Sequence, residues 1–134
     1  MKSILITIAF MAVFSVARAQ QTDTTKQAPI FTAVEQEPTP VGGMGVFYQY
    51  LANNIHYPDD AKKRNIQGKV FLTFVVEKDG TLSNIQVLRG VSDDINAEAV
   101  RVFKNAPKWN PGIQRGRPVR VQYNVPISFT LQNN

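Results

Sequence analysis

The 134-residue chain contains no cysteine and only one histidine. The absence of cysteine excludes a disulfide framework, a thiol nucleophile, a thiolate metal site and a lipid-modified N-terminal cysteine. His56 has three alternative interpretations, as a structural or surface residue, as part of a peptide groove, or as a catalytic base. A catalytic base needs a nucleophile or an orienting carboxylate, and no motif supplies either. The sequence therefore predicts a protein that is not an enzyme and holds no metal or cofactor.

Long hydrophobic runs are absent after the N-terminus, where residues 4–17 are mostly apolar. Lys2 gives a positive start, and Ala17-Arg18-Ala19 has the small-x-small form of a cleavage site, so residues 1–19 are typical of a secretory signal peptide. A run of this length falls short of the roughly 20 residues that cross a bilayer as a helix, which favours cleavage over an uncleaved anchor. We expect export across the inner membrane, which argues against nucleic acid as a partner.

Acidic residues are absent from residues 101–120, a segment with six basic residues. The six basic residues between positions 101 and 120 are Arg101, Lys104, Lys108, Arg115, Arg117 and Arg120. The whole chain has a net charge of +5, and loss of Lys2 and Arg18 with the signal peptide leaves 13 basic against 10 acidic residues, or +3. One interpretation is an ordinary solvated surface. The alternative is attraction to an acidic peptide or to an anionic envelope polymer such as peptidoglycan.

The chain divides into a polar leader and one folded domain. Residues 20–27 are polar, and the breakers Pro38, Pro40 and Gly42-Gly43 mark the entrance to the domain. The sequence thus predicts a flexible leader over residues 20–41 and a domain over residues 42–134. Apolar residues make up 43% of the whole chain, so a folded domain with a core of its own is expected.

Three helices are expected. Apolar residues at three- and four-residue spacing predict a helix over residues 44–54, and Pro58 suits the first turn of a short helix over residues 59–65. Ser92 can cap a third helix, which Pro107 ends. We expect core or near-core positions for the single tryptophan and for most aromatic residues, namely Trp109, Phe47, Tyr48, Tyr50, Phe74, Phe103 and Phe129.

Two strands and a turn precede the third helix. Residues 68–77 are apolar on both faces, which is typical of a central strand. The tight turn Lys78-Asp79-Gly80 predicts a hairpin with a second strand over residues 81–88. After the third helix, residues 109–112 are expected to form a turn.

The last stretch, residues 117–132, has the clearest pattern in the chain. Every odd position from Val119 to Leu131 is apolar or aromatic, and the even positions are polar or charged residues and Pro126. This alternation predicts a strand with one buried face and one face in contact with water. Pro126 has no N–H for a sheet ladder, which favours an edge strand. A long open edge is either an aggregation hazard or a docking site for another strand.

The expected fold class is α+β. The hairpin makes the first two long strands antiparallel, and the third helix is long enough to carry the last strand to the far side of the first. We therefore predict a small antiparallel three-stranded sheet of order 2-1-3, with helices packed on one face.

Several short motifs, in this order and at these spacings, resemble one family. They are Tyr57-Pro58, Ala61, Gly68-x-Val70, Phe74-x-Val76, Asp79-Gly80, Val87, Ala99, Trp109-x-Pro111-Gly112, Gly116-x-Pro118-Val119 and Phe129. Together they resemble the C-terminal domain of TonB, the energy transducer of gram-negative envelopes, over about residues 42–132. The resemblance implies a small α+β domain in the periplasm.

The resemblance also implies a partner and a site. The C-terminal strand of the family accepts the TonB box, a short peptide of an outer-membrane transporter, by strand addition, and pulling on it is thought to open the transporter. The residues that this implies here are Asn54, Ile55 and His56 before the Tyr-Pro pair, and Arg117, Val119, Arg120, Val121, Gln122, Tyr123, Asn124 and Val125 in the strand. A homodimer through the same strand is an alternative use of the edge.

This sequence departs from full transducers in its N-terminal part. Transducers have an uncleaved membrane helix and a long proline-rich spacer, whereas a flexible leader of about 22 residues spans only about 25 Å. We therefore expect a peptide-binding domain that supports or modulates energy-coupled transport of nutrients or siderophores. A free periplasmic adaptor, a regulator, a competitor for transporter peptides and an envelope-binding domain without transport coupling remain alternatives.

Overall fold

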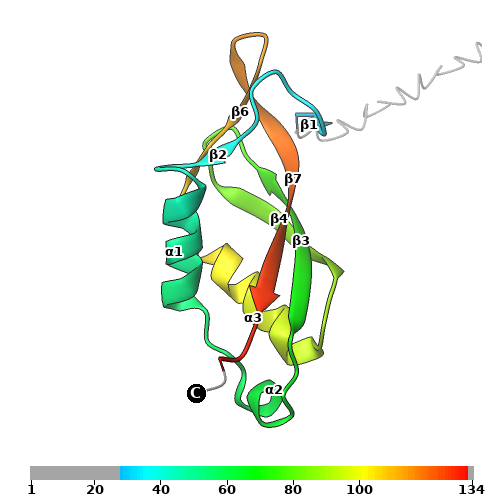
Figure 1. The fold of residues 1–134 in the computed structure, drawn as a ribbon. Helices are drawn as coiled ribbons and strands as arrows, with labels where there is room; N and C mark the ends of the chain where they lie inside the picture. The colour runs from blue at the N-terminus through cyan, green and yellow to red at the C-terminus, as the bar shows by residue number, and fades with distance from the viewer. Residues whose placement is uncertain (1–27, 133–134) are drawn as a thin grey trace, which may run out of the picture.

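The computed structural model describes residues 28–132 (Figure 1). The predicted signal peptide and residues 20–27 of the predicted leader lie outside the described residues. Within residues 28–132, no helix combines the length and the apolar character needed to cross a membrane.

The long elements lie where the sequence predicts them, with ends that differ by a few residues. The helices are α1 (Met44–Asn54), α2 (Asp59–Lys63) and α3 (Asp93–Lys104), and the long strands are β3 (Gly68–Val76), β4 (Leu82–Arg89) and β7 (Arg117–Phe129). Ser92 caps α3 as expected, because its side chain accepts a hydrogen bond from the Ile95 N–H. The short strands are β1 (Ile30–Phe31), β2 (Thr39–Pro40), β5 (Trp109–Asn110) and β6 (Gly112–Gln114).

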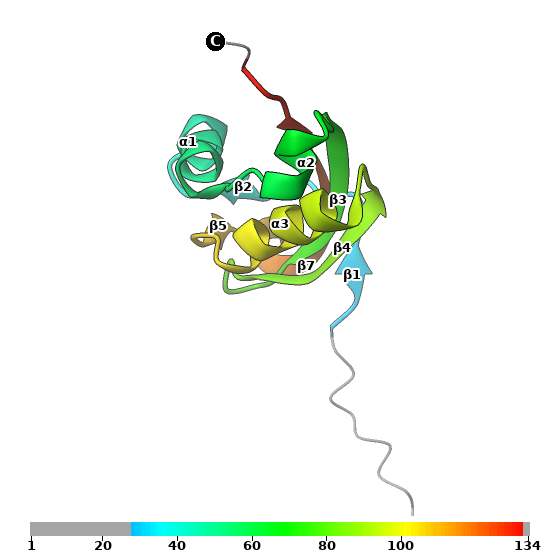
Figure 2. The same ribbon diagram turned by 90° about the horizontal axis from the view of Figure 1, so that it is seen from below.

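The three long strands have the predicted order. β3 lies between β4 and β7 and is antiparallel to both, with Val70 opposite Ile127 and Leu72 opposite Val87. This confirms the α+β class and the central position of β3, whose two apolar faces had indicated it. All three helices lie on one side of the sheet, as predicted (Figure 2).

The sheet is larger than predicted and not purely antiparallel. β1 pairs with β7 in parallel, with Ile30 opposite Arg120, and β6 pairs with the first residues of β7, so the sheet has five strands within residues 28–132. Strands of two or three residues are too short to show a clear hydrophobic period. The weak apolar pattern of residues 30–36 indicates a short extended segment there, but not its pairing with β7.

A second small sheet ties the leader to the domain. Thr39–Pro40 pairs with Trp109–Asn110, so the expected turn over residues 109–112 is wrong in its first half, where the chain is extended. β1 and β2 both belong to the leader predicted over residues 20–41. The described part of that leader is therefore paired with the domain, and the folded unit begins before Gly42.

An aromatic cluster forms the centre of the core between α1, α3 and the sheet. Ring centroids lie 5.2 Å apart for Phe47 and Trp109, 5.3 Å for Phe74 and Phe103, and 5.4 Å for Trp109 and Tyr123. Such tilted and edge-to-face pairs are favourable arrangements of aromatic rings. The core positions expected for Phe47, Phe74, Phe103, Trp109 and Phe129 are confirmed, since all are at most 2% exposed.

Tyr48 is the exception among the expected core aromatics, because half of its surface is exposed. Its neighbours Phe47 and Leu51 in α1 are buried. The apolar stripe of α1 is therefore wider than the face that the sheet covers. This uncovered part of the stripe borders the candidate site described below.

The turn between β3 and β4 is fixed against β5. Gly80 has a φ of +85°, in the left-handed region that favours glycine, and its carbonyl accepts a hydrogen bond of 2.8 Å from the Trp109 N–H. A Cβ atom at Gly80 would lie 1.9 Å from the Trp109 carbonyl oxygen. Only glycine fits this contact between the hairpin and the core tryptophan.

Candidate peptide-binding edge

Every residue of the strand β7 pairs with a neighbouring strand on at least one edge. One edge of its second half has no partner strand within residues 28–132. β6 pairs with residues 117–119, β1 pairs with Arg120 and Val121, and β3 pairs with residues 121–129. Within the part of the chain that the structure describes, no strand pairs with the edge of residues 122–129 that faces away from β3. The open edge is therefore real but shorter than the sequence predicts, because the leader and the β6–β7 hairpin fold back onto the start of β7.

A groove runs beside this open edge, between α1 and β7. It encloses about 410 Å³, and it is lined by Tyr48, Leu51, Ala52, Ile55, Lys69, Pro126, Ile127 and Ser128. α1 lies on the side of β7 away from β3 and β4 (Figures 1 and 2). The groove and the open edge thus adjoin each other at residues 126–128.

Most residues that line the groove were not expected from the sequence. Ile55 is the one lining residue that also belongs to the predicted peptide-binding residues. The width of the apolar stripe on α1 could have indicated the helix side of the groove. Tyr48 and Leu51 belong to the same pattern of three- and four-residue spacing, although only Leu51 is buried. Pro126 marks the facing side, because a proline in an otherwise regular strand indicates an edge without a ladder partner.

The segment after α1 is held against α3. The His56 N–H donates to the Glu98 carboxylate at 2.9 Å, and the Arg101 guanidinium donates to the Asn54 carbonyl at 2.8 Å. Arg101 also pairs with Glu98, and this hydrogen-bonded ion pair lowers the pKa of the Glu98 carboxyl. The backbone on both sides of Ile55 is therefore anchored while Ile55 lines the groove.

His56 itself lies apart from the groove. It lines a different cavity of about 480 Å³ next to α3, together with Tyr57, Pro58, Asp94 and Glu98 among others. The structure thus brings Ile55, but not His56, beside the candidate edge.

The side chains of the predicted strand residues divide between core and surface. Val121 and Val125 are buried, and Tyr123 packs on Trp109, so the side chains of these three residues belong to the core and are not offered to a ligand. On the opposite face of the sheet, Gln122 donates to the Thr73 hydroxyl at 3.0 Å and Asn124 is exposed.

Arg120 has a structural role in this arrangement. Its guanidinium pairs with Glu77 and also donates to the Ala28 carbonyl at 2.9 Å. The hydrogen bond from Arg120 to Glu77 lowers the pKa of the Glu77 carboxyl. The neighbouring predicted residues Arg117 and Val119 lie in the part of β7 that β6 covers. The predicted contacts at residues 117–121 are therefore already occupied by this chain's own strands.

The run of basic residues does not form one site. Arg101 is bound to Glu98 on α3 and Arg120 to Glu77, whereas Arg115 and Arg117 line a cavity at the β6–β7 hairpin. Residues 28–132 also contain no group of three or more metal-ligating side chains that could hold an ion.

The fold and the site define a small α+β domain whose C-terminal strand is half open. Residues 53–131 match the family described as Gram-negative bacterial TonB protein C-terminal, and the chain belongs to this family. The resemblance predicted from the short motifs is thereby confirmed.

Similar proteins include the TonB proteins of two Helicobacter pylori strains, ATCC 700392 / 26695 and J99 / ATCC 700824. Each is 27% identical over 85 residues, which cover 63% of this chain but only 28% and 29% of the relatives. The chain thus spans less than a third of the length of these curated relatives.

Solved structures of the same kind support the fold. An NMR structure of the H. pylori TonB C-terminal domain is 25% identical, has a TM-score of 0.52, and is matched over 68% of this chain and 95% of that chain. A longer fragment of the same domain is 22% identical with a TM-score of 0.51, over 68% and 82% of the two chains, and shows the fold alone.

Proposed function

We propose that this protein binds an extended peptide by adding it as a strand to the open edge of β7. The observation that carries the proposal is the unpaired edge of residues 122–129 beside the groove under α1. The partner proposed is the TonB box of an outer-membrane TonB-dependent transporter. The protein would then act in the periplasm, where the predicted signal peptide delivers it, and would support or modulate energy-coupled transport without catalysing a reaction.

The direction of the backbone groups supports strand addition. Pro126 lies opposite Phe71 without interrupting the pairing of β3 and β7, which is expected where the proline nitrogen faces away from β3. Backbone groups alternate in direction along a strand, so Gln122 and Asn124 share the direction of Pro126. Their N–H and C=O groups would be the ones that bond a guest strand, with no donor at Pro126 itself.

The groove supplies the contact that a guest side chain needs. Leu51 and Ile127 give it apolar walls, and Ala52 leaves space between them. In strand addition the main chain gives affinity, while pockets for alternate side chains give specificity. At about 3.3 Å per residue, the eight residues 122–129 offer roughly 26 Å, enough for a short peptide.

The proposed site therefore differs in part from the set expected by resemblance. Gln122, Asn124 and Ile55 belong both to that set and to the proposed site, while Tyr123 and Val125 have buried side chains on the core face of the same strand. Contact of a guest with Arg117, Val119, Arg120 or Val121 would require that β1 or β6 first leave their places on β7.

A proline substitution tests the proposal directly. Asn124→Pro removes a donor that faces the guest rather than β3, whereas Asn124→Ala changes the same side chain and keeps the donor. In calorimetric titration with a synthetic TonB-box peptide, we expect Asn124→Pro to weaken binding about tenfold or more, a loss of about 1.4 kcal/mol, and Asn124→Ala to have little effect. Equal affinities of the two variants, with circular dichroism showing both folded, would contradict strand addition at this edge.

A further inference from the structure

A third cavity lies at the tip of the β6–β7 hairpin, on the far side of β1 from the open edge. It encloses about 710 Å³ and is lined by Phe31, Lys78, Gln114, Arg115, Arg117, Pro118 and Val119. Its size falls within the usual range of ligand pockets, about 300–1,000 Å³. Three of its lining residues are basic and none is acidic.

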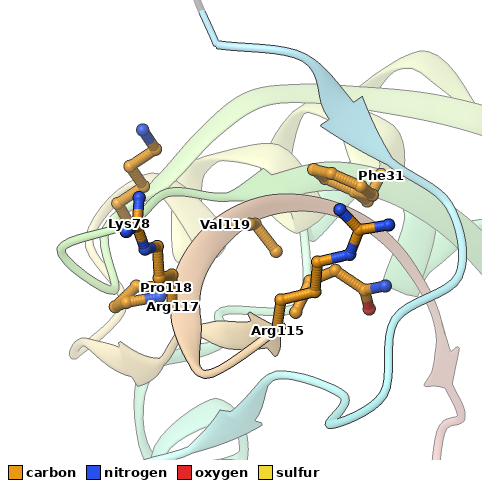
Figure 3. Close-up of a pocket in the computed structure, with 7 residues that line it drawn as sticks. Phe31, Lys78, Arg115, Arg117, Pro118 and Val119 are labelled. Carbon is orange, nitrogen blue, oxygen red and sulfur yellow. The ribbon is translucent and has the colours of Figure 1, made fainter.

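The three basic residues come from two turns that the fold brings together. Lys78 lies in the turn between β3 and β4, while Arg115 and Arg117 belong to the β6–β7 hairpin. Lys78 and Arg117 stand on one side of Val119, and Arg115 extends on the other side toward Phe31 (Figure 3). The cations therefore lie on two sides of the apolar residue Val119.

Lys78, Arg115 and Arg117 form no ion pair within residues 28–132. Among residues 28–132, ion pairs engage Arg64, Arg101 and Arg120, but not Lys78, Arg115 or Arg117. The acids beside Lys78 are committed elsewhere, because Glu77 binds Arg120 and the Asp79 carboxylate accepts a hydrogen bond of 2.7 Å from the Thr81 hydroxyl. The cavity thus has positive charge without an internal counterion in the described residues.

The backbone at Arg115 points to a role for its side chain. Arg115 and Gly116 form the two-residue loop between β6 and β7, with φ of +52° and +73°. Loops of this type favour asparagine followed by glycine, because both residues need positive φ. Arginine is a poor residue for this conformation, and a disfavoured backbone state in a ligand-sized cavity is a reason to look for function.

We propose that this cavity binds an acidic peptide segment, with Lys78, Arg115 and Arg117 holding carboxylates and with Phe31, Pro118 and Val119 contacting an adjacent apolar side chain. Guanidinium groups match the planar geometry of carboxylates in two-point hydrogen bonds. A membrane surface fits less well, because Phe31 and Val119 are half-buried in the recess instead of protruding into a bilayer. The proposal does not depend on strand addition, since β1 separates the cavity from the open edge.

The probe for this site is a fluorescein-labelled peptide of alternating glutamate and leucine, seven residues long, with its glutamine-for-glutamate counterpart as a control. Fluorescence anisotropy with the whole protein should show binding of the acidic peptide alone, weakened when NaCl rises from 50 to 500 mM. Arg115→Asn combined with Arg117→Gln should weaken this binding at least tenfold. Lys62→Gln, which removes an exposed lysine of α2, should leave it unchanged.

Arg115→Asn by itself separates a binding role from a structural one. Asparagine suits the loop better than arginine, so this variant should unfold at the same or a higher urea concentration while it binds the acidic peptide more weakly. Equal binding by wild type and by the double variant would overturn the proposal. So would binding to phosphatidylglycerol vesicles or to inorganic phosphate in place of the peptide, since either result would assign the cavity to another anion.

Discussion

Arg120 and Glu77, 43 residues apart in the chain, form a two-point ion pair. The Arg120 Nε lies 2.6 Å from Glu77 Oε2, and Nη2 lies 3.0 Å from Oε1. The remaining Nη1 donates to the Ala28 carbonyl at 2.9 Å, just before β1. One guanidinium therefore joins the end of β3, the start of β7 and the leader, and it helps to determine where the open edge of β7 begins.

The Glu77 ion pair predicts a dependence of stability on pH. The Arg120 hydrogen bond lowers the pKa of Glu77 in the folded state below the ordinary value of 4.5. The folded state then binds fewer protons than the unfolded state in mild acid, so the stabilisation is present above the unfolded pKa and is lost as pH falls through the folded one.

Glu77→Gln should therefore lower stability at pH 7 and flatten its decline in acid, between about pH 5 and pH 3. Urea unfolding at several pH values measures both effects. Glu37→Gln is a suitable control, because Glu37 is exposed and takes part in no ion pair among residues 28–132. An identical pH profile for Glu77→Gln and wild type would show that the ion pair contributes nothing.

Gly80 should be intolerant of any side chain. Gly80→Ala combines a positive φ of +85° with a collision at 1.9 Å against the Trp109 carbonyl oxygen, so we expect a loss of about 3 kcal/mol or more. Gly116→Ala has a similar φ of +73° but no atom within 4 Å, and should cost only about 1 kcal/mol. The difference between the two midpoints of urea unfolding isolates the steric contact, and equal costs would refute it.

The aromatic cluster should dominate the stability of the core. Phe74 is 1% exposed and lies against Phe103, Trp109 and Tyr123, so Phe74→Ala should cost about 3–5 kcal/mol. Phe71 is in the same strand but on the opposite face and is 36% exposed. Phe71→Ala should cost much less, about 1 kcal/mol, and a comparison of the two variants by thermal unfolding tests which face forms the core.

Filling the groove should weaken peptide binding without loss of stability. Ala52 is exposed on α1 and lines the groove, so Ala52→Trp should occupy the space of a guest side chain and weaken TonB-box peptide binding about tenfold, or about 1.4 kcal/mol. Gln49→Trp places the same side chain on an exposed position of α1 that does not line the groove. Both variants should unfold like wild type, and equal weakening by both would count against the groove.

Local sequence patterns were sufficient for the long elements. The apolar spacing of α1 and the breakers before it predict Met44–Asn54 to the residue, because an amphipathic helix is a local pattern. The two apolar faces of β3 indicate its central place, and Pro126 indicates that one edge of β7 is free. These are properties of single segments, which the order of residues can encode directly.

The partners of each segment were decided by tertiary structure. Two-residue strands such as β1 have no period, so nothing in the sequence shows that Ile30–Phe31 covers Arg120 and Val121 and shortens the open edge. The groove exists only because α1 packs beside β7, and the charged cavity only because Lys78 and the hairpin of Arg115 meet. The sequence by itself determined which segments form the helices and the long strands and to which family the chain belongs. Only packing between distant segments decided where the short strands pair and which edges and charges remain free to bind.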